Sequence, residues 1–324
     1  MTLAPWLREP LRRLSDAARA NRLHHALLIA GDEGLGKRDL ADALVAAVLC
    51  QQPDIEGCAC GRCKSCLLIA AGTHPDRAHV TFETRDDGKL RSELTVDQIR
   101  ALAARLSLTS QFGGLQFAIV VPADAMNVSA ANALLKTLEE PASDTVIILV
   151  CDRPARLPAT IRSRCQRVNV PYPAHTVALA WLEAQGVAAK DAETALAASL
   201  GNPGKALAFA GDDQLQLRAA CIDDLKRLAA GRANGNDIAE RWAGDRPAQR
   251  LWFASVHARE LGVVAASKAD RLTARREIPK LGSWFVAANH ARRLLDSTLR
   301  PELLLLDLLR SWPVTTEMSP RKSA

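Results

Sequence analysis

The sequence predicts an α/β P-loop domain, a parallel sheet flanked by helices, followed by helical domains. Three observations predict this fold class. A glycine-rich segment at 31–38, GDEGLGKR, directly follows an unbroken apolar run at 26–30. Apolar residues spaced four apart from Leu40 onward then indicate a helix to about Cys50. Strand and helix signals alternate to about residue 167, and only helical patterns follow it.

The other elements of the first domain follow from apolar runs and from helix start and stop signals. The expected strands lie at 23–30, 78–82, 117–121 and 145–150. A capping-box sequence at Thr95 opens a helix to about Leu106. A second helix is expected from Ala130 to Glu139, where Pro141 stops it. Strands that alternate with helices form a parallel sheet, which binds ligands at the carboxyl ends of its strands.

Breaks in the pattern divide the remainder of the chain. The segment PYP at 171–173 is typical of a linker, and further breaks fall at 201–204 and 231–236. We therefore expect three domains, namely 1–168 with a metal-binding module at about 50–66, a small helical domain at 169–211, and a helical domain at 212–324. The polar tail from Met318 is expected to fray.

Bulk composition excludes few classes of protein. No apolar run reaches the ~18–20 residues that a membrane span needs, and the N-terminus lacks a signal-peptide core. A cytoplasmic protein with no membrane partner is therefore expected. The net charge of +6 and the pI of about 9.0 permit contact with nucleic acid. Because the excess charge is spread along the chain, a basic protein without that role fits almost as well.

The glycine-rich segment is a phosphate-binding loop that lacks one part. Gly31, Gly34, Gly36 and Lys37 match the pattern that closes backbone N–H groups and an ammonium on phosphate oxygens. Arg38 stands where serine or threonine would supply the hydroxyl for Mg²⁺. Phosphate binding without hydrolysis would be compatible with this loop. An empty loop, in which Arg38 fills the phosphate space, would be equally compatible.

A second part of a hydrolytic site is also absent. In P-loop ATPases a strand ends in Asp-Glu, which supports Mg²⁺ and polarises the attacking water. Val121 and Pro122 occupy these two positions, and neither can bind a metal or act as a base. Asp124 follows, and we expect it to face the next turn. Two losses on separate segments predict a chain with no ATPase activity of its own.

Five of the eight cysteines fall in one short stretch, which indicates a metal site rather than disulfides. Cys60, Cys63 and Cys66 have the spacing of zinc knuckles. Either Cys58, close by in sequence, or Cys50, at the end of the predicted helix, could complete the set. Four thiolates leave no open position for catalysis, so the zinc would be structural. A redox-active cluster is the alternative.

One arginine has the setting of a residue that acts on a neighbouring subunit. Arg164 lies in Ser163-Arg164-Cys165, ahead of the last strand of the domain, and so at the domain edge. An arginine supplied in trans stabilises the charge on a transferring phosphoryl group. Taken alone, a tripeptide of this kind would more simply be a surface arginine in a salt bridge.

Several longer segments resemble the bacterial clamp-loader subfamily of AAA+ proteins. They are HALL at 25–28, the knuckle followed by GTHPD at 72–76, NALLKTLEEP at 132–141, and LPATIRSRC at 157–165. The resemblance is strong over about residues 20–210 and rests on helical pattern and length beyond them. The broken Mg²⁺ site together with the intact Ser-Arg-Cys matches the family's non-hydrolysing member. The family's gamma/tau ATPase would be expected to keep both Mg²⁺-binding parts.

The resemblance implies roles for individual residues. Arg164 would be the arginine finger for ATP held by an adjacent gamma/tau subunit. Zinc would be bound by the family's set, Cys50, Cys60, Cys63 and Cys66. The segment GNPGK at 201–205 resembles the start of the sensor-2 helix, with Lys205 where arginine is usual. The domain at 169–211 would be the lid and that at 212–324 the collar that oligomerises these subunits.

The resemblance also implies an assembly. The family forms a five-subunit ring with gamma/tau and delta subunits, which opens the sliding clamp and places it on primed DNA. The complex belongs to a DNA-directed DNA polymerase, although this chain's own nucleotide site would be empty or non-hydrolysing. An active clamp-loader ATPase with unusual Mg²⁺ ligation is one alternative. A P-loop nucleotide kinase or a zinc-regulated DNA-binding protein is another, which the helical last third of the chain disfavours.

Overall fold

The computed structural model describes residues 3–313 apart from 55, 56, 86, 212, 268–270, 296 and 298, and it leaves the side chains of 271–277 undescribed. The predicted frayed tail from Met318 lies outside the described residues. The chain forms two compact units, one of residues 1–181 with 202–205 and one of residues 182–201 with 206–324. The expected three-domain division remains a prediction.

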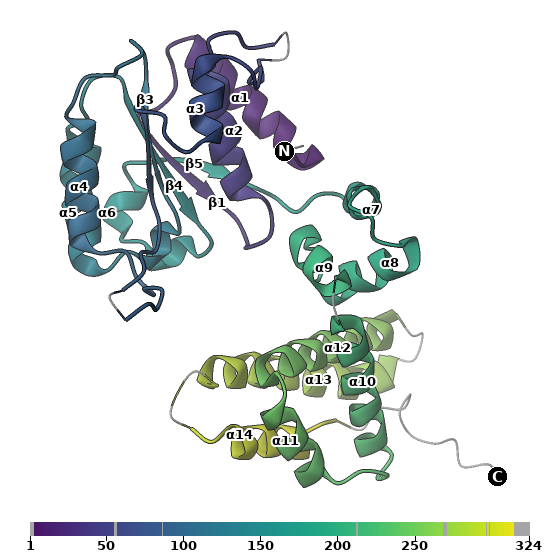
Figure 1. Ribbon diagram of the computed structural model, residues 1–324. Coiled ribbons are helices and arrows are strands. Elements are labelled where there is room, and N and C mark those ends of the chain that lie inside the picture. The colour runs from purple at the N-terminus through teal and green to yellow at the C-terminus, as the bar shows by residue number, and fades with distance from the viewer. Residues whose placement is uncertain are drawn as a thin grey trace. The chain divides into compact units, whose positions relative to one another are not determined.

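A five-stranded parallel sheet forms the centre of the first unit (Figure 1). Its order is β2-β3-β4-β1-β5, with β1 Ala26–Ala30, β2 Arg77–Val80, β3 Gln116–Val120, β4 Thr145–Cys151 and β5 Gln166–Asn169. The apolar runs predicted the first four strands to within a few residues. The strand expected from residue 23 begins at Ala26, whose N–H donates to Nδ1 of His24 (3.1 Å).

Helices cover both faces of this sheet (Figure 1). They are α1 Arg8–Arg19, α2 Lys37–Leu49, α3 Lys64–Ala70, α4 Val96–Leu106, α5 Val128–Glu139 and the short α6 Ala159–Arg162. Alternate residues of β1 point to opposite sides. Leu27 packs into the cluster that holds α1 and α2, whereas Leu28 packs into the cluster that holds α4 and α5. The parallel sheet flanked by helices predicted from the sequence is confirmed.

The expected start of α4 is present in detail. The side chain of Gln98 accepts the backbone N–H of Thr95 (2.9 Å), as a capping box requires. The sequence reasoning missed α1, although its buried residues Leu11, Leu14 and Ala18 follow helical spacing. It also missed α3, which is too short to show a period.

The turn after α3 ties the cysteine-rich module to the sheet. Buried His74 accepts the N–H of Asp76 at Nδ1 (3.1 Å), so its Nε2–H donates to Ser65 Oγ on α3 (2.8 Å). Burial lowers the pKa of His74. The Asp76 carboxylate accepts the backbone N–H groups of Gln111 (2.7 Å) and Phe112 (3.0 Å). The segment before β3 is thereby held beside the start of β2.

The second unit is helical throughout its described residues, as predicted. Its helices include α8 Ala189–Ala198, α10 Gln214–Ala229, α11 Gly235–Gly244, α12 Pro247–Ser267, α13 Arg271–Leu294 and α14 Pro301–Arg310. Two further helices, α7 His175–Ala184 and α9 Pro203–Ala210, have residues in both units. Fully buried Trp242 donates its Nε1–H to Asp224 Oδ2 (2.9 Å), and Trp284 donates to the Leu308 carbonyl (2.9 Å). Tryptophans therefore join neighbouring helices through both apolar area and hydrogen bonds.

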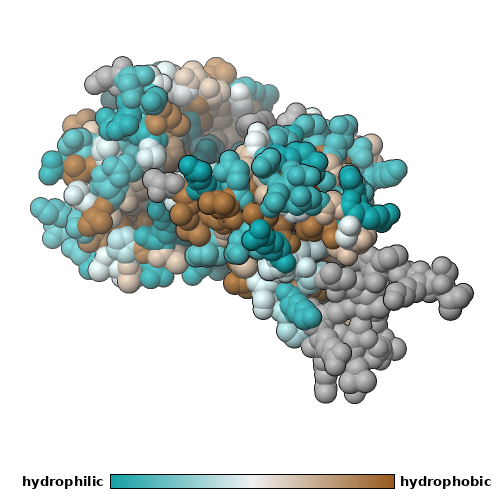
Figure 2. Space-filling view, turned by 90° about the horizontal axis from the view of Figure 1, so that it is seen from below, coloured by the Kyte–Doolittle hydropathy of each residue, from teal (hydrophilic) through white to brown (hydrophobic). Residues whose placement is uncertain are grey.

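Some apolar side chains of the second unit face outward. Val263, Val286 and Leu303 are exposed on three different helices. On the face seen from below in Figure 2, hydrophobic residues gather in patches among hydrophilic ones. None of the described helices combines the length and apolarity needed to cross a bilayer.

Asp76→Ala is expected to lower the free energy of unfolding by about 1–3 kcal/mol, because it leaves the backbone N–H groups of Gln111 and Phe112 without the carboxylate that accepts them. Urea denaturation followed by circular dichroism measures the change. Asp97→Ala, an exposed carboxylate on α4, is the matched control and should cost less than about 1 kcal/mol. Equal losses in the two variants would contradict the role assigned to Asp76.

Candidate functional site

The phosphate loop follows β1 at the carboxyl edge of the sheet, and a distant segment closes over it. Asn202 donates its side-chain amide to the Glu33 carbonyl (2.7 Å). The N–H of Gly204 donates to the Gly34 carbonyl (3.1 Å). Gly34 has φ +89°, and a Cβ there would lie 2.6 Å from Asn202 Oδ1. Glycine is therefore required at this position for both the backbone conformation and the contact with Asn202.

The loop lysine is already neutralised by a carboxylate of the same chain. Lys37 is 4% exposed, and its Nζ lies 2.6 Å from Asp152 Oδ1 and 2.6 Å from the Asp32 carbonyl. A buried ammonium needs an anionic partner. In a nucleotide-bound loop that partner would be phosphate, whereas here Asp152 provides it. The sequence reasoning missed Asp152, although its place just after the strand at 145–150 could have pointed to it.

Arg38 is exposed in the first turn of α2, while the buried Lys37 beside it pairs with Asp152. The α-helix begins at Lys37, so the two side chains project from successive positions of the helix in different directions. The two alternatives open from the sequence, phosphate binding without hydrolysis and an empty loop with Arg38 in the phosphate space, both stay predictions.

The segment after β3 lacks the carboxylates of a hydrolytic site and uses its one acid elsewhere. Val121 is buried and apolar, and Pro122 has no ligating side chain. Asp124, which is 8% exposed, accepts the N–H of Asp152 (3.3 Å) and pairs with Arg153 Nε (3.5 Å). It thus faces the turn after β4 and holds the residue that neutralises Lys37.

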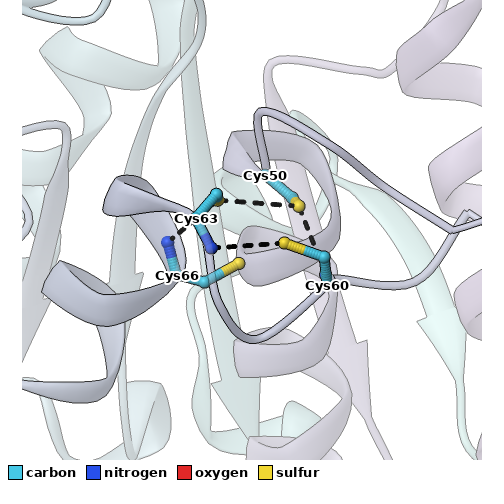
Figure 3. A group of neighbouring side chains, drawn as sticks. All are labelled: Cys50, Cys60, Cys63 and Cys66. Carbon is cyan, nitrogen blue, oxygen red and sulfur yellow. Dashed lines mark hydrogen bonds between the residues drawn. The ribbon is translucent and has the colours of Figure 1, made fainter.

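Four cysteines lie together at the end of α2 and the start of α3 (Figure 3). The sulfur atoms of Cys50, Cys60, Cys63 and Cys66 are all within 4.8 Å of one another, and those of Cys50 and Cys63 are 3.9 Å apart. Cys58 is outside this group. The structure therefore brings together the set that contains Cys50 rather than Cys58.

Backbone N–H groups point at these sulfur atoms. The N–H of Cys60 donates to Cys50 (3.3 Å), that of Cys63 to Cys60 (3.4 Å) and that of Cys66 to Cys63 (3.4 Å). Burial raises the pKa of the Cys63 thiol, but hydrogen bonds from the Cys66 and Gln51 backbones outweigh this and lower it to about 6. Such donors favour thiolates, which are the form that binds a metal ion. A soft set of four sulfurs suits Zn²⁺.

Arg164 and the phosphate loop lie at opposite ends of the strands, with Arg164 at the amino ends and the loop at the carboxyl ends. Arg164 lies two residues before β5, an edge strand, and β5 runs parallel to β1. Gly31 follows the carboxyl end of β1, whose five residues span roughly 16 Å. Arg164 is 38% exposed, donates Nη1 to the Thr160 carbonyl (3.0 Å) and pairs with Glu139 (2.5 Å). Arg164 and the loop of its own chain therefore lie at opposite ends of the strands.

Comparison with known proteins gives the family. A family model described as "DNA polymerase III, delta subunit" matches residues 6–173, about half of the chain. "DNA polymerase III subunit delta'" of Yersinia pestis is 33% identical over 96% of both chains. The chain belongs to the delta-prime family of DNA polymerase III subunits.

Two other delta-prime relatives are more similar over a shorter length. The protein of Pseudomonas aeruginosa is 42% identical over 67% of this chain, and that of Escherichia coli is 40% identical over 66%. The matched segment spans 65% and 63% of these two relatives, which is just under two thirds of their length.

Cys63→Ser is expected to abolish stoichiometric zinc binding and to lower the free energy of unfolding by at least about 2 kcal/mol, because metal binding is coupled to folding. Elemental analysis and thermal unfolding measure the two effects. Cys58→Ser is the matched control and should retain zinc. Lower pH should release the metal, since protons compete for the thiolates. Wild-type protein purified without any bound zinc would contradict the metal site.

Proposed function

We propose that this chain is a non-hydrolysing clamp-loader subunit that helps to place the sliding clamp on primed DNA in the cytoplasm. In this proposal it joins gamma/tau and delta subunits in a hetero-oligomeric ring and donates Arg164 to the ATP site of a neighbouring gamma/tau subunit. Its membership of the delta-prime family supports the assembly. Zinc on the four clustered cysteines has a structural role that fixes the module to the end of α2.

The pair between Lys37 and Asp152 is the observation that carries the non-hydrolysing role. A nucleotide phosphate would have to displace a carboxylate held 2.6 Å from the loop lysine. Asp124 anchors the backbone of that carboxylate. With Arg38 exposed and Val121 and Pro122 at the acidic positions, the site also lacks the ligands and the base that Mg²⁺-dependent hydrolysis needs.

The position of Arg164 supports action in trans. The side chain lies at the amino ends of the strands, whereas its own loop lies at their carboxyl ends. It is partly exposed beside the outermost strand, β5. A guanidinium there is available to a neighbouring chain that docks against this edge. It would stabilise negative charge on the γ-phosphoryl group as the bond to the leaving group breaks.

The second unit supplies a surface for assembly. Exposed apolar residues lie on α12, α13 and α14, and apolar patches of this kind mark protein interfaces. We assign residues 212–324 to the collar that joins the ring and residues 169–211 to the lid. Contacts with DNA would come from lysines and arginines that recognise phosphate.

The purified chain alone is expected to hydrolyse no ATP above background, because its lysine is neutralised and Mg²⁺ has no protein ligands. A coupled-enzyme assay with Mg²⁺ and ATP measures turnover. Lys37→Ala is the matched variant and should give the same background rate. Robust turnover that disappears in Lys37→Ala would instead identify the chain as an active clamp-loader ATPase.

Arg164→Ala is expected to leave assembly intact and to slow ATP turnover at the adjacent site by roughly 10³-fold. Turnover of the whole loader falls less, since its other ATP sites keep their own arginines. Mass measurement of the complex reports assembly, and steady-state turnover with clamp and primed DNA reports catalysis. Arg162→Ala, two residues earlier, is the control. Unchanged turnover in Arg164→Ala would leave Arg164 as a surface charge only.

A further inference from the structure

The end of α5 holds the side chain of Arg164. α5 ends at Glu139, and the Glu139 carboxylate lies 2.5 Å from Nη2 of Arg164. The Thr160 carbonyl on α6 accepts Nη1 of the same guanidinium (3.0 Å). The Glu139 carboxylate on α5 and the Thr160 carbonyl on α6 therefore hold the Arg164 guanidinium through its two terminal nitrogens.

A contact of the preceding residue holds the backbone beside Glu139. The carbonyl of Leu138 accepts Nε2–H of His25 (3.1 Å), which ties the last turn of α5 to the segment that enters β1. A carboxylate at a helix C-terminus lies at the negative end of the helix dipole and gains from a nearby cation. Arg164 meets both that carboxylate and the negative ends of α5 and α6.

Stability does not explain this pair. Glu139 is 48% exposed and Arg164 is 38% exposed, and ion pairs with this exposure contribute little to folding. What the pair does restrict is the direction of a long side chain that would otherwise sample many rotamers. The guanidinium keeps further N–H groups beyond these two contacts, so a held Arg164 still has donors for a phosphate.

We propose that Glu139 is a positioning residue for Arg164. It holds the guanidinium at the edge of the sheet in one orientation before the neighbouring ATP arrives, so that less ordering remains for the transition state. This inference rests on the proposed function, in which Arg164 acts on that ATP. It assigns a role to a residue outside the Ser-Arg-Cys motif.

The test uses the full clamp loader, in which only the ATP site served by Arg164 keeps its arginine finger. The gamma/tau subunits carry alanine at their own equivalent arginines, so that Arg164 of this chain is the finger that remains. Glu139→Gln keeps the size and a hydrogen-bonding side chain but removes the charge. We expect kcat to fall by roughly threefold to tenfold with KM for ATP unchanged. Glu140→Gln, which removes the same charge one residue later, should leave kcat unchanged.

A double-mutant cycle separates positioning from a general structural effect. In the Arg164→Ala background, Glu139→Gln should have no further effect, because the group it positions is absent. An unchanged or increased kcat in Glu139→Gln, or an equal decrease in both backgrounds, would overturn the proposal. If Arg164→Ala itself leaves turnover unchanged, the proposed function fails first, and the two failures are thus distinguishable.

Discussion

The parallel pairing of β1 with β4 and β5 decides which residues lie at each end of the strands. Because all three strands run the same way, the segments that follow the strands lie together at their carboxyl ends, and the segments that precede the strands lie together at their amino ends. The phosphate loop and Asp152 lie at the carboxyl ends, and Arg164 lies at the amino ends. The phosphate loop and Arg164 of one chain therefore lie at opposite ends of the strands.

The phosphate loop is joined to its surroundings by a short series of contacts. Lys37 is buried, which would be costly for an unpaired ammonium, and Asp152 offsets its charge. Asp124 accepts the backbone N–H of Asp152. Lys37, Asp152 and Asp124 are thus linked by direct contacts. The cysteine module is fixed to the same helix, α2, at its other end.

Local signals in the sequence were enough for most elements and for three of the four clustered cysteines, while Cys50 came from the family resemblance. Apolar runs marked β1, β3 and β4, and the knuckle spacing marked three of the four clustered thiols. The partners that cross the fold could not be predicted, because they depend on tertiary placement. Asp152 is far from Lys37 in sequence, and the pair between Glu139 and Arg164 joins the end of α5 to the turn before β5. The short, exposed β5 has almost no apolar run of its own.

The hydrogen bond between Asn202 and Glu33 spans 169 positions of the chain. A ribosome makes the chain from the N-terminus and releases domains in that order. The strand before the phosphate loop can pair once β4 and β5 have been made, but the segment that closes over the loop is made later still. During that interval the loop is open, and the chain passes through a stage in synthesis in which its loop is more accessible than it is in the finished protein.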